Sequence, residues 1–472
     1  MSNVPVMGST FLFGYVSAIK MLSTYKQTLL DGYVKFNKHA FQIPGLLGWV
    51  VFVSSDLYDD VRKARDDSLS MVEASKDNFA FQYTLGQNVV NDAWHNSVVR
   101  KQMTQNLGAK FPEISDEIAT ALEDGLNLSA DDDWKSIDAH DLLEEIICRT
   151  SNRLFIGLPL CRNPEYTKIS REFSITVIQS GLLINLFPSF LRPLVARYVS
   201  PAPKAIKGFE KYMVPIIEER WRLERELGDA WADKKPNDFL QWMMDDRTGS
   251  QRDARDLTTR MLTLTFASTH TTTMSLTHVL YWLAAKPEHV PALREEVGRA
   301  IELHGWTRAA INDMHKLDSF IKESTRCSAL MAMGMPRKAM RDVTLSDGTL
   351  VPKGAKLAIN IPAVYSDPSL FPTPETFDPW RSSRKIEQGE NEVKHALTTA
   401  SSDFLLWGGG EHVCAGRYLA AQEMKTILAH ILLNYEIKFA GLPAGVRPKD
   451  KWVAYSCLPD LKARVLFRRR QS

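Results

Sequence analysis

The chain of 472 residues carries 58 Lys and Arg against 56 Asp and Glu, and 44% of its residues are hydrophobic. This composition is typical of a folded globular protein with a large core, and it excludes a disordered, collagen-like or coiled-coil chain. A formal charge of +2 gives no nucleic-acid footprint, so we expect no nucleic-acid partner. Five cysteines without a CxxC pair argue against a disulfide framework and a zinc ribbon.

Two apolar stretches near the N-terminus have some features of membrane segments. Phe11–Ile19 has no basic residue before it, as a signal peptide requires, and Phe41–Ser55 contains Pro and Gly and a β-branched run. Neither reaches the roughly 20 apolar residues of a membrane-spanning helix. We therefore expect no such helix in the chain, and we expect a strand near Gly48–Ser54.

Most of the remaining sequence mixes polar and apolar residues at helical spacing, with few strand signals. No linker composition separates two domains. The sequence therefore predicts one mainly α fold over residues 1–472, with a small β lobe from about 35–60 and 340–365. The main predicted elements, in chain order, are a helix over Arg255–Ala285, a helix over Leu317–Met333, strands and turns within Val343–Ile359, a Pro-rich irregular segment over Ile361–Ser383, a helix over Gly416–Leu433 and a strand pair near the C-terminus.

The segment Phe404–Arg417 is the most informative part of the chain. Three consecutive glycines allow a tight loop, and Cys414 follows just before a predicted helix. Free amide groups and the helix dipole lower a thiol pKa there, as an anionic metal ligand requires. An axial thiolate of this kind favours O–O cleavage at a haem iron. The alternative is a buried structural cysteine, which the constrained spacing of Trp, Gly, His, Cys and Gly disfavours.

This segment resembles the haem-binding loop Phe-x-x-Gly-x-x-x-Cys-x-Gly of the cytochrome P450 superfamily. The resemblance implies the fold of that family, a triangular helical prism around a buried haem b. It implies that Cys414 is the iron ligand, that His412 takes the place of a basic residue that binds a haem propionate, and that Trp407 stands where Phe is usual. The loop residues expected to bind the cofactor are Trp407, Gly408, Gly410, His412 and Gly416.

Two further motifs precede the loop in the order of the family. Glu323 and Arg326 match its Glu-x-x-Arg helix motif, and Arg381 ends the segment Phe377–Arg381 that supplies a second arginine. Residues three apart share a helix face, so the first two side chains can pair and Arg381 can join the same carboxylate. A solvated ion pair is the alternative for the helix motif alone. The resemblance implies a buried structural triad.

The propionates of a buried haem require basic or donor groups. By resemblance, Arg337 occupies the family position after the Glu-x-x-Arg helix, and Arg100 resembles the arginine of the helix that covers the opposite haem edge. The Trp-x-x-x-Arg spacing of the family is broken here, because Asn96 stands where Trp is expected. His95 is the candidate substitute, and exposure of His95 at the surface is the alternative.

The segment Phe266–Thr273 resembles the oxygen-binding helix of the family, with Ala267 opening a groove and Thr271 donating a hydrogen bond to bound O2. His270 replaces the usual acid, and a histidine can relay protons near neutral pH. The alternatives are a packed histidine and threonines that bond back to the preceding turn.

The resemblance also indicates where substrate binds. An apolar pocket suits a lipophilic substrate such as a terpenoid or another secondary metabolite, although core packing explains the same residues equally well. The candidate pocket residues are Phe79, Phe266, Met331, Met333, Met335, Cys457 and Leu458.

The family chemistry implies O2 and a separate NADPH-dependent reductase as partners, since no flavin or dinucleotide loop is evident in the chain. The alternatives are a haem-thiolate peroxygenase or rearranging enzyme that needs no reductase, and a non-catalytic haem protein. Fungal relatives imply the cytoplasmic face of the endoplasmic reticulum membrane, and this chain begins about where their membrane helix ends. The apolar stretch Gly181–Leu194 is either a peripheral membrane contact or a buried helix joint.

Overall fold

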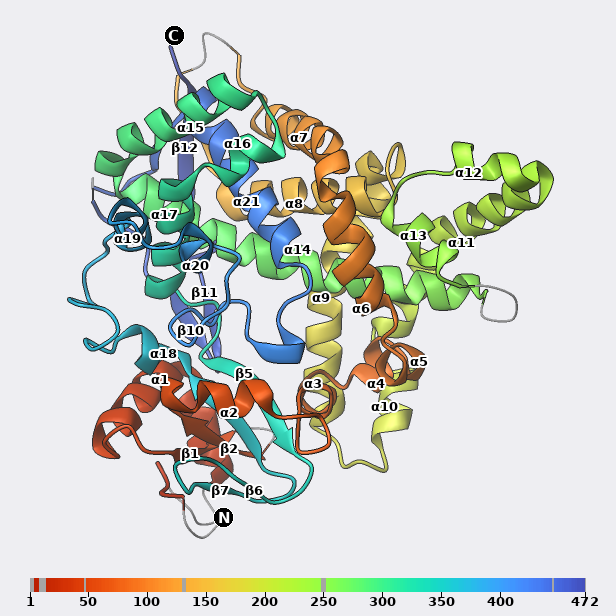
Figure 1. Cartoon of the computed structure of the whole chain (residues 1–472). Coiled ribbons are helices and arrows are strands. Elements are labelled where there is room, and N and C mark those ends of the chain that lie inside the picture. The colour runs from red at the N-terminus through yellow and green to blue at the C-terminus, as the bar shows by residue number, and fades with distance from the viewer. Residues whose placement is uncertain are drawn as a thin grey trace.

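The computed structural model describes residues 4–7, 14–45, 48–129, 133–247, 252–443 and 445–471. Helices form most of the molecule, and a β sheet lies at the end that holds the N-terminus (Figure 1). This arrangement confirms a mainly α fold with a small β lobe. Phe11–Phe13, the start of the apolar stretch considered as a signal segment, lie outside the described residues.

Helices of very different length make up the α part of the fold. The long helices are α1 (Gly14–Lys35), α7 (Thr104–Leu126), α8 (Ala139–Phe155), α9 (Pro164–Asn185), α11 (Ala202–Leu227), α14 (Ala254–Ala285), α15 (Val290–His304), α17 (His315–Cys327) and α21 (Arg417–Asn434). The short helices are α2 (Tyr58–Lys63), α3 (Met71–Phe79), α4 (Phe81–Thr84), α5 (Gln87–Asn91), α6 (His95–Val98), α10 (Arg192–Tyr198), α12 (Trp231–Lys234), α13 (Phe239–Asp245), α16 (Arg308–Asn312), α18 (Ile361–Tyr365), α19 (Arg381–Glu387) and α20 (Glu392–His395).

The largest sheet has the strand order β1-β2-β8-β5-β3. Strands β2 and β8 are parallel, and every other neighbouring pair in this sheet is antiparallel. The β-branched run of β2 is buried on both faces, which explains why it does not alternate with polar residues. The strands are β1 (Phe41–Gly45), β2 (Gly48–Val53), β3 (Leu69–Ser70), β4 (Lys135–Asp138), β5 (Met333–Ala339), β6 (Val343–Thr344), β7 (Leu350–Val351), β8 (Lys356–Asn360), β9 (Tyr435–Phe439), β10 (Lys451–Val453), β11 (Ser456–Leu458) and β12 (Arg464–Arg469).

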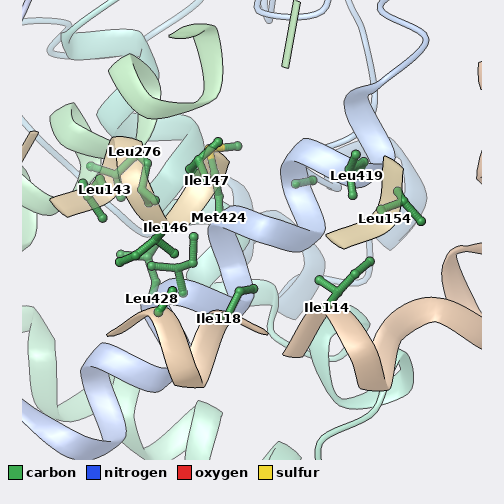
Figure 2. Close-up of a cluster of buried hydrophobic side chains, with 14 of the residues drawn as sticks. Ile114, Ile118, Leu143, Ile146, Ile147, Leu154, Leu276, Leu419, Met424 and Leu428 are labelled. Atoms are coloured by element: carbon green, nitrogen blue, oxygen red, sulfur yellow. The ribbon is translucent and has the colours of Figure 1, made fainter. Parts of the chain in front are cut away.

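The main core lies where α7, α8, α14 and α21 meet. Figure 2 shows buried hydrophobic side chains that these four helices contribute to this core. Full burial of one such side chain stabilises the fold by about 1.5–3 kcal/mol. Because α21 follows the Cys414 loop directly, this packing fixes the loop to the centre of the molecule. The labelled residues are Ile114, Ile118, Leu143, Ile146, Ile147, Leu154, Leu276, Leu419, Met424 and Leu428.

The predicted helices over Arg255–Ala285 and Gly416–Leu433 are confirmed as α14 and α21, whereas the end of the helix predicted over Leu317–Met333 is wrong. That helix, α17, ends at Cys327, and the chain beyond it pairs with the C-terminal hairpin. The amide of Ala332 donates to the carbonyl of Tyr455 at 2.7 Å, and the amide of Cys457 donates to Leu330 at 3.0 Å. These distant contacts compete with the helix, and β5 then starts at Met333.

The Pro-rich segment forms no continuous helix, as expected, although α18 occupies one turn at its start. Among the described residues, no helix is both long and apolar enough to cross a membrane.

Candidate functional site

The Cys414 loop has a shape that only glycine permits at two of its positions. Gly408 and Gly410 have φ angles of +70° and +69°. A Cβ at Gly410 would lie 2.1 Å from the carbonyl oxygen of Arg62, so α2 packs directly against the loop backbone. Gly416 differs, because its φ is −85° and no atom lies within 4 Å of a Cβ built there.

Cys414 ends this loop in an exposed position just before α21. Its amide donates to the carbonyl of Trp407 at 2.9 Å. The sequence predicted a lowered pKa for the Cys414 thiol, and for the protein without a bound metal this prediction is wrong. The protein packed around the loop raises the pKa of Cys414, and the amide groups of Gly416 and Arg417 oppose this effect.

Trp407 does not direct its polar group at the sulfur. The indole Nε1 donates to the carbonyl oxygen of Leu397 at 2.6 Å, and the ring is buried. The indole N–H is therefore engaged with the backbone of Leu397. The aromatic ring contributes bulk beside the loop and anchors it to the preceding segment.

The structure brings the three residues of the proposed triad together. Arg326 donates from Nε and Nη2 to the two oxygens of Glu323, both at 2.8 Å, and Arg381 Nε donates to Glu323 Oε1 at 3.2 Å. Glu323 and Arg326 are buried, which excludes the solvated ion pair. The two arginines also donate to backbone carbonyls of the Pro-rich segment, among them Pro374 and Pro372. The triad thus fastens that segment to α17.

Arg337 is buried, and it forms no ion pair with any acid that the structure describes. Only 2% of the residue is exposed, its Nε has no hydrogen-bond partner, and Nη1 donates only to the neighbouring carbonyl of Pro336. Desolvation lowers the pKa of Arg337 to about 10, and Asp66 opposes this weakly. A buried guanidinium normally pairs with an acid, so this position fits the carboxylate of a bound group such as haem.

Two other candidate propionate donors, Arg100 and His412, lie at the Cys414 loop, and each already has a partner. Arg100 is exposed, and its Nη2 donates to the carbonyl of Glu411 at 2.6 Å. His412 Nε2 lies 3.1 Å from Asp66 Oδ1, so the candidate propionate partner already has an acidic neighbour.

His95 is buried, and the alternative of a surface histidine is wrong. Its Nδ1 lies 3.1 Å from Nη1 of Arg260 in α14. Burial is the main cause that lowers the pKa of His95 to about 4, with Arg260 second, so the ring is neutral at pH 7. Its expected role toward haem stays a prediction.

The middle of α14 has an open side. Ala267 and Thr271 are exposed although buried residues flank them along the helix, so a space lies beside this turn. Thr271 Oγ1 donates to the carbonyl of Ala267 at 2.7 Å, which is the back-bonding expected of a helical threonine.

His270 directly precedes Thr271 in α14 and belongs to a small group of titratable side chains. Burial lowers its pKa, and the other charges that act on it are those of Glu144 and His140 in α8. Nδ1 of His270 and Nε2 of His140 are both buried without partners. Glu144 accepts from Nε of Arg171 in α9 at 2.9 Å, and Arg171 also binds Glu145 near the surface. Sequence motifs gave no signal for this group, because its members are far apart in the chain.

A chamber of about 610 Å³ lies between α9, α14, β5, β8 and the β10–β11 hairpin, and most of its lining is apolar. Phe79, Met333 and Leu458 line it, as predicted. Four other candidates do not line it, which corrects the predicted pocket. Phe266 packs edge-on against Phe79, Met335 lies in the sheet core, Met331 precedes β5, and Cys457 points to the opposite side of β11 from Leu458.

Cys457 belongs to a second group with His278 and Asp450, whose ligand-type atoms lie within 4.8 Å of one another. The guanidinium of Arg447 already neutralises the Asp450 carboxylate of this group. Arg447 Nη1 donates to Asp450 Oδ1 at 2.7 Å, and Arg447 Nη2 lies 2.8 Å from His278 Nδ1. Burial is the main cause that raises the pKa of Cys457, and the thiol is buried in a strand rather than at a helix start. This site therefore suits an axial thiolate less well than Cys414 does.

A cysteine loop before a helix, a helix with an open turn and a buried arginine without an acidic partner among the described residues are features that a haem-thiolate site requires. The family model described as Cytochrome P450 matches residues 8–465. The chain therefore belongs to the cytochrome P450 family.

Relatives of similar length agree. Cytochrome P450 monooxygenase 103 of Postia placenta is 34% identical over 469 residues, which cover 99% of this chain and 93% of that protein. Cytochrome P450 monooxygenase 110 of the same fungus is 36% identical over 474 residues, with 100% and 94% covered. Ent-kaurene oxidase of Gibberella intermedia is 31% identical over 477 residues, with 99% and 88% covered. The chain is thus an enzyme of the P450 monooxygenase class.

Proposed function

We propose that the chain binds haem b through Cys414 and inserts one oxygen atom of O2 into a lipophilic small molecule. The observation that carries this proposal is the position of Cys414. All five cysteines are among the described residues, and Cys414 alone is exposed, at the start of a helix and at the end of a glycine loop. Haem iron with a thiolate ligand supplies O2 activation when it is bound there.

The chain's own residues have separate tasks in this proposal. Arg337 supplies the buried positive charge that a propionate neutralises, and Arg100 and His412 lie beside the loop as further donors. Thr271 presents a hydroxyl at the open turn of α14. His270 precedes Thr271 in the helix, and burial lowers its pKa, so its imidazole is neutral at rest, becomes imidazolium when it accepts a proton and returns to the neutral form when it releases it.

The apolar chamber supports a lipophilic substrate. Its walls are formed by aliphatic and aromatic side chains such as Ile175, Ile178 and Leu182 of α9 and Met274 of α14. A relative named Ent-kaurene oxidase acts, by that name, on a diterpene hydrocarbon. We therefore place a terpenoid or a secondary metabolite of similar size first among the substrate classes.

The test is turnover with a panel of diterpenes and triterpenes, an added NADPH-dependent reductase and O2. Oxygenated products that require all three components support the proposal. Products formed with hydrogen peroxide but not with the reductase would instead establish a peroxygenase or rearranging enzyme. Haem binding without any product over the panel would favour a non-catalytic haem protein.

A basic hollow beside the Cys414 loop supports a reductase partner. It measures about 1000 Å³ and contains more Lys and Arg than Asp and Glu. Arg417 in its wall also donates from Nη1 to the carbonyl of Cys414 at 2.9 Å, so the surface connects directly to the iron ligand. An acidic redox protein fits this surface by charge. The charged lining residues are Arg62, Lys63, Arg308, Arg417, Lys425, Asp318, Glu392 and Glu411.

The stretch Gly181–Leu194 is not a buried helix joint as a whole. Leu186, Phe190 and Leu194 are 79%, 75% and 55% exposed, and within the stretch only Gly181 and Ile184 are buried. An apolar surface of this kind, next to the exposed Arg197, supports peripheral contact with an anionic membrane such as the cytoplasmic face of the endoplasmic reticulum. Co-sedimentation with anionic vesicles should fall in a double L186S/F190S variant, and unchanged binding would refute this contact.

A further inference from the structure

Lys356 is the charged group of the chamber that the proposed chemistry does not use. It lies at the start of β8, where its side chain is half-buried and lines the same chamber as Phe79 and Met333. Its ammonium donates to the amide oxygen Oδ1 of Asn78 at 2.8 Å. Within the part of the chain that the structure describes, Lys356 has no ion pair.

The acids near Lys356 are already engaged. Asp77 is the carboxylate that acts on it, but Asp77 Oδ2 pairs with Lys338 at 2.8 Å, and Lys338 itself repels Lys356. Lys338 and Lys356 face each other across the β5–β8 pair. The sheet end of the chamber therefore has an excess of positive charge, and burial lowers the pKa of Lys356 because the opposing effect of Asp77 is smaller than the loss of hydration.

The other end of the chamber has the opposite character. Glu144, His140 and His270 line it, and Glu144 remains bonded to Arg171. Of the three fully charged lining residues, Arg337 is assigned to haem in the proposed function and Glu144 has its own partner. An anionic group inside this apolar space would be attracted to Lys356 and repelled by Glu144.

We propose that the substrate is a lipophilic carboxylic acid whose carboxylate binds Lys356, with its apolar body directed toward His270 and Met274. This inference rests on the proposed haem function, because the reacting end of the substrate must lie near the iron. A charge-assisted hydrogen bond to a buried ammonium is strong because few waters compete for it. A neutral relative of the same skeleton lacks that bond and leaves the ammonium uncompensated.

Two structural roles for Lys356 compete with this proposal. Asn78 lies in the last turn of α3, where a cation stabilises the helix C-terminus. Lys356 could also contact a haem propionate, since Leu357, the next residue in β8, lies opposite Arg337 of β5. In either structural role, loss of Lys356 should weaken the binding of acids and of neutral compounds equally. If Lys356 binds the substrate carboxylate, its loss should weaken only the binding of acids.

The test uses probes that attach to the iron at one end, so binding is visible whatever the natural skeleton. The holoenzyme is titrated with ω-imidazolyl alkanoic acids of eight, ten and twelve carbons and with their methyl esters, and the Soret shift gives each Kd. The variants are Lys356→Gln and, as the matched control, Lys353→Gln, which changes an exposed lysine three residues earlier in the chain. The haem content and thermal unfolding of each variant are measured in parallel.

We expect at least one acid to bind the wild type and K353Q about tenfold more tightly than its ester, and K356Q to lose this preference while its affinity for the ester is unchanged. Equal affinity of acids and esters for the wild type at every length would overturn the proposal. An equal loss for acid and ester in K356Q, with lower stability or haem content, would assign Lys356 to α3 or to haem. A purified protein without a Soret band would overturn the proposed haem function itself, whereas a holoenzyme that shows no Soret shift with any acid would overturn only the substrate proposal.

Discussion

Replacement of Arg337 by Met should weaken haem retention strongly. Desolvation lowers the pKa of this arginine from its usual range above 12 to about 10, because no acid among the described residues pairs with it. A difference of about two pKa units corresponds to ~3 kcal/mol. If a haem propionate restores that energy, loss of the guanidinium should lower haem affinity by about 100-fold.

The assay is transfer of haem from the ferric protein to an excess of apomyoglobin, followed by the Soret band. R337M should lose haem much faster than the wild type, and R337K should be intermediate because Lys keeps the charge but not the planar donor pair. An R337M variant that retains haem as long as the wild type would refute the reasoning. It would show that the unpaired guanidinium has no anionic partner in the holoenzyme.

Three other substitutions test the rest of the site. Gly410→Ala should reduce thermal stability by about 2 kcal/mol or more, because the new Cβ meets the Arg62 carbonyl at a positive φ, whereas Gly416→Ala should be nearly neutral, and equal effects would contradict the loop geometry. Glu323→Gln should cost about 3–5 kcal/mol and deplete the haem-loaded protein, since it leaves buried guanidinium charge uncompensated, and a normal yield and melting temperature would argue against the triad. His270→Ala should raise the fraction of NADPH oxidation that ends as hydrogen peroxide, and an unchanged fraction would exclude His270 from proton transfer.

The sequence predicted those parts of the site that short motifs encode. The triad could be anticipated because Glu323 and Arg326 share one helix turn and Arg381 follows in a recognisable segment. The same holds for the Cys414 loop, where glycine content alone restricts the backbone. The ends of α14 and α21 were also predictable within a residue, because α14 has an Asp cap at its start and α21 follows the glycine loop directly.

Other features depend on contacts between distant segments and could not be read locally. The last predicted turns of α17 are lost because Ala332 pairs with Tyr455 of the C-terminal hairpin. The proximity of His140 to His270 follows from the packing of α8 on α14, and that of Lys356 to Asn78 from the position of α3 beside the sheet.

Strand alternation explains the chamber residues that were assigned incorrectly. Leu458 lines the chamber while its neighbour Cys457 faces the group around Asp450. The sequence prediction had no register for β11, because its partner strand β10 is only three residues long. The helix predicted over Leu317–Met333 ended where β5 begins, so the side of β5 on which Met335 lies could not be predicted.

The most direct test of the central claim is the spectrum of the reduced protein with carbon monoxide, recorded for the wild type, Cys414→Ser and Cys457→Ser. The account predicts a red-shifted Soret band typical of a thiolate ligand in the wild type and in C457S, and its loss in C414S. A band that persists in C414S, or that disappears in C457S instead, would contradict the assignment of the iron ligand.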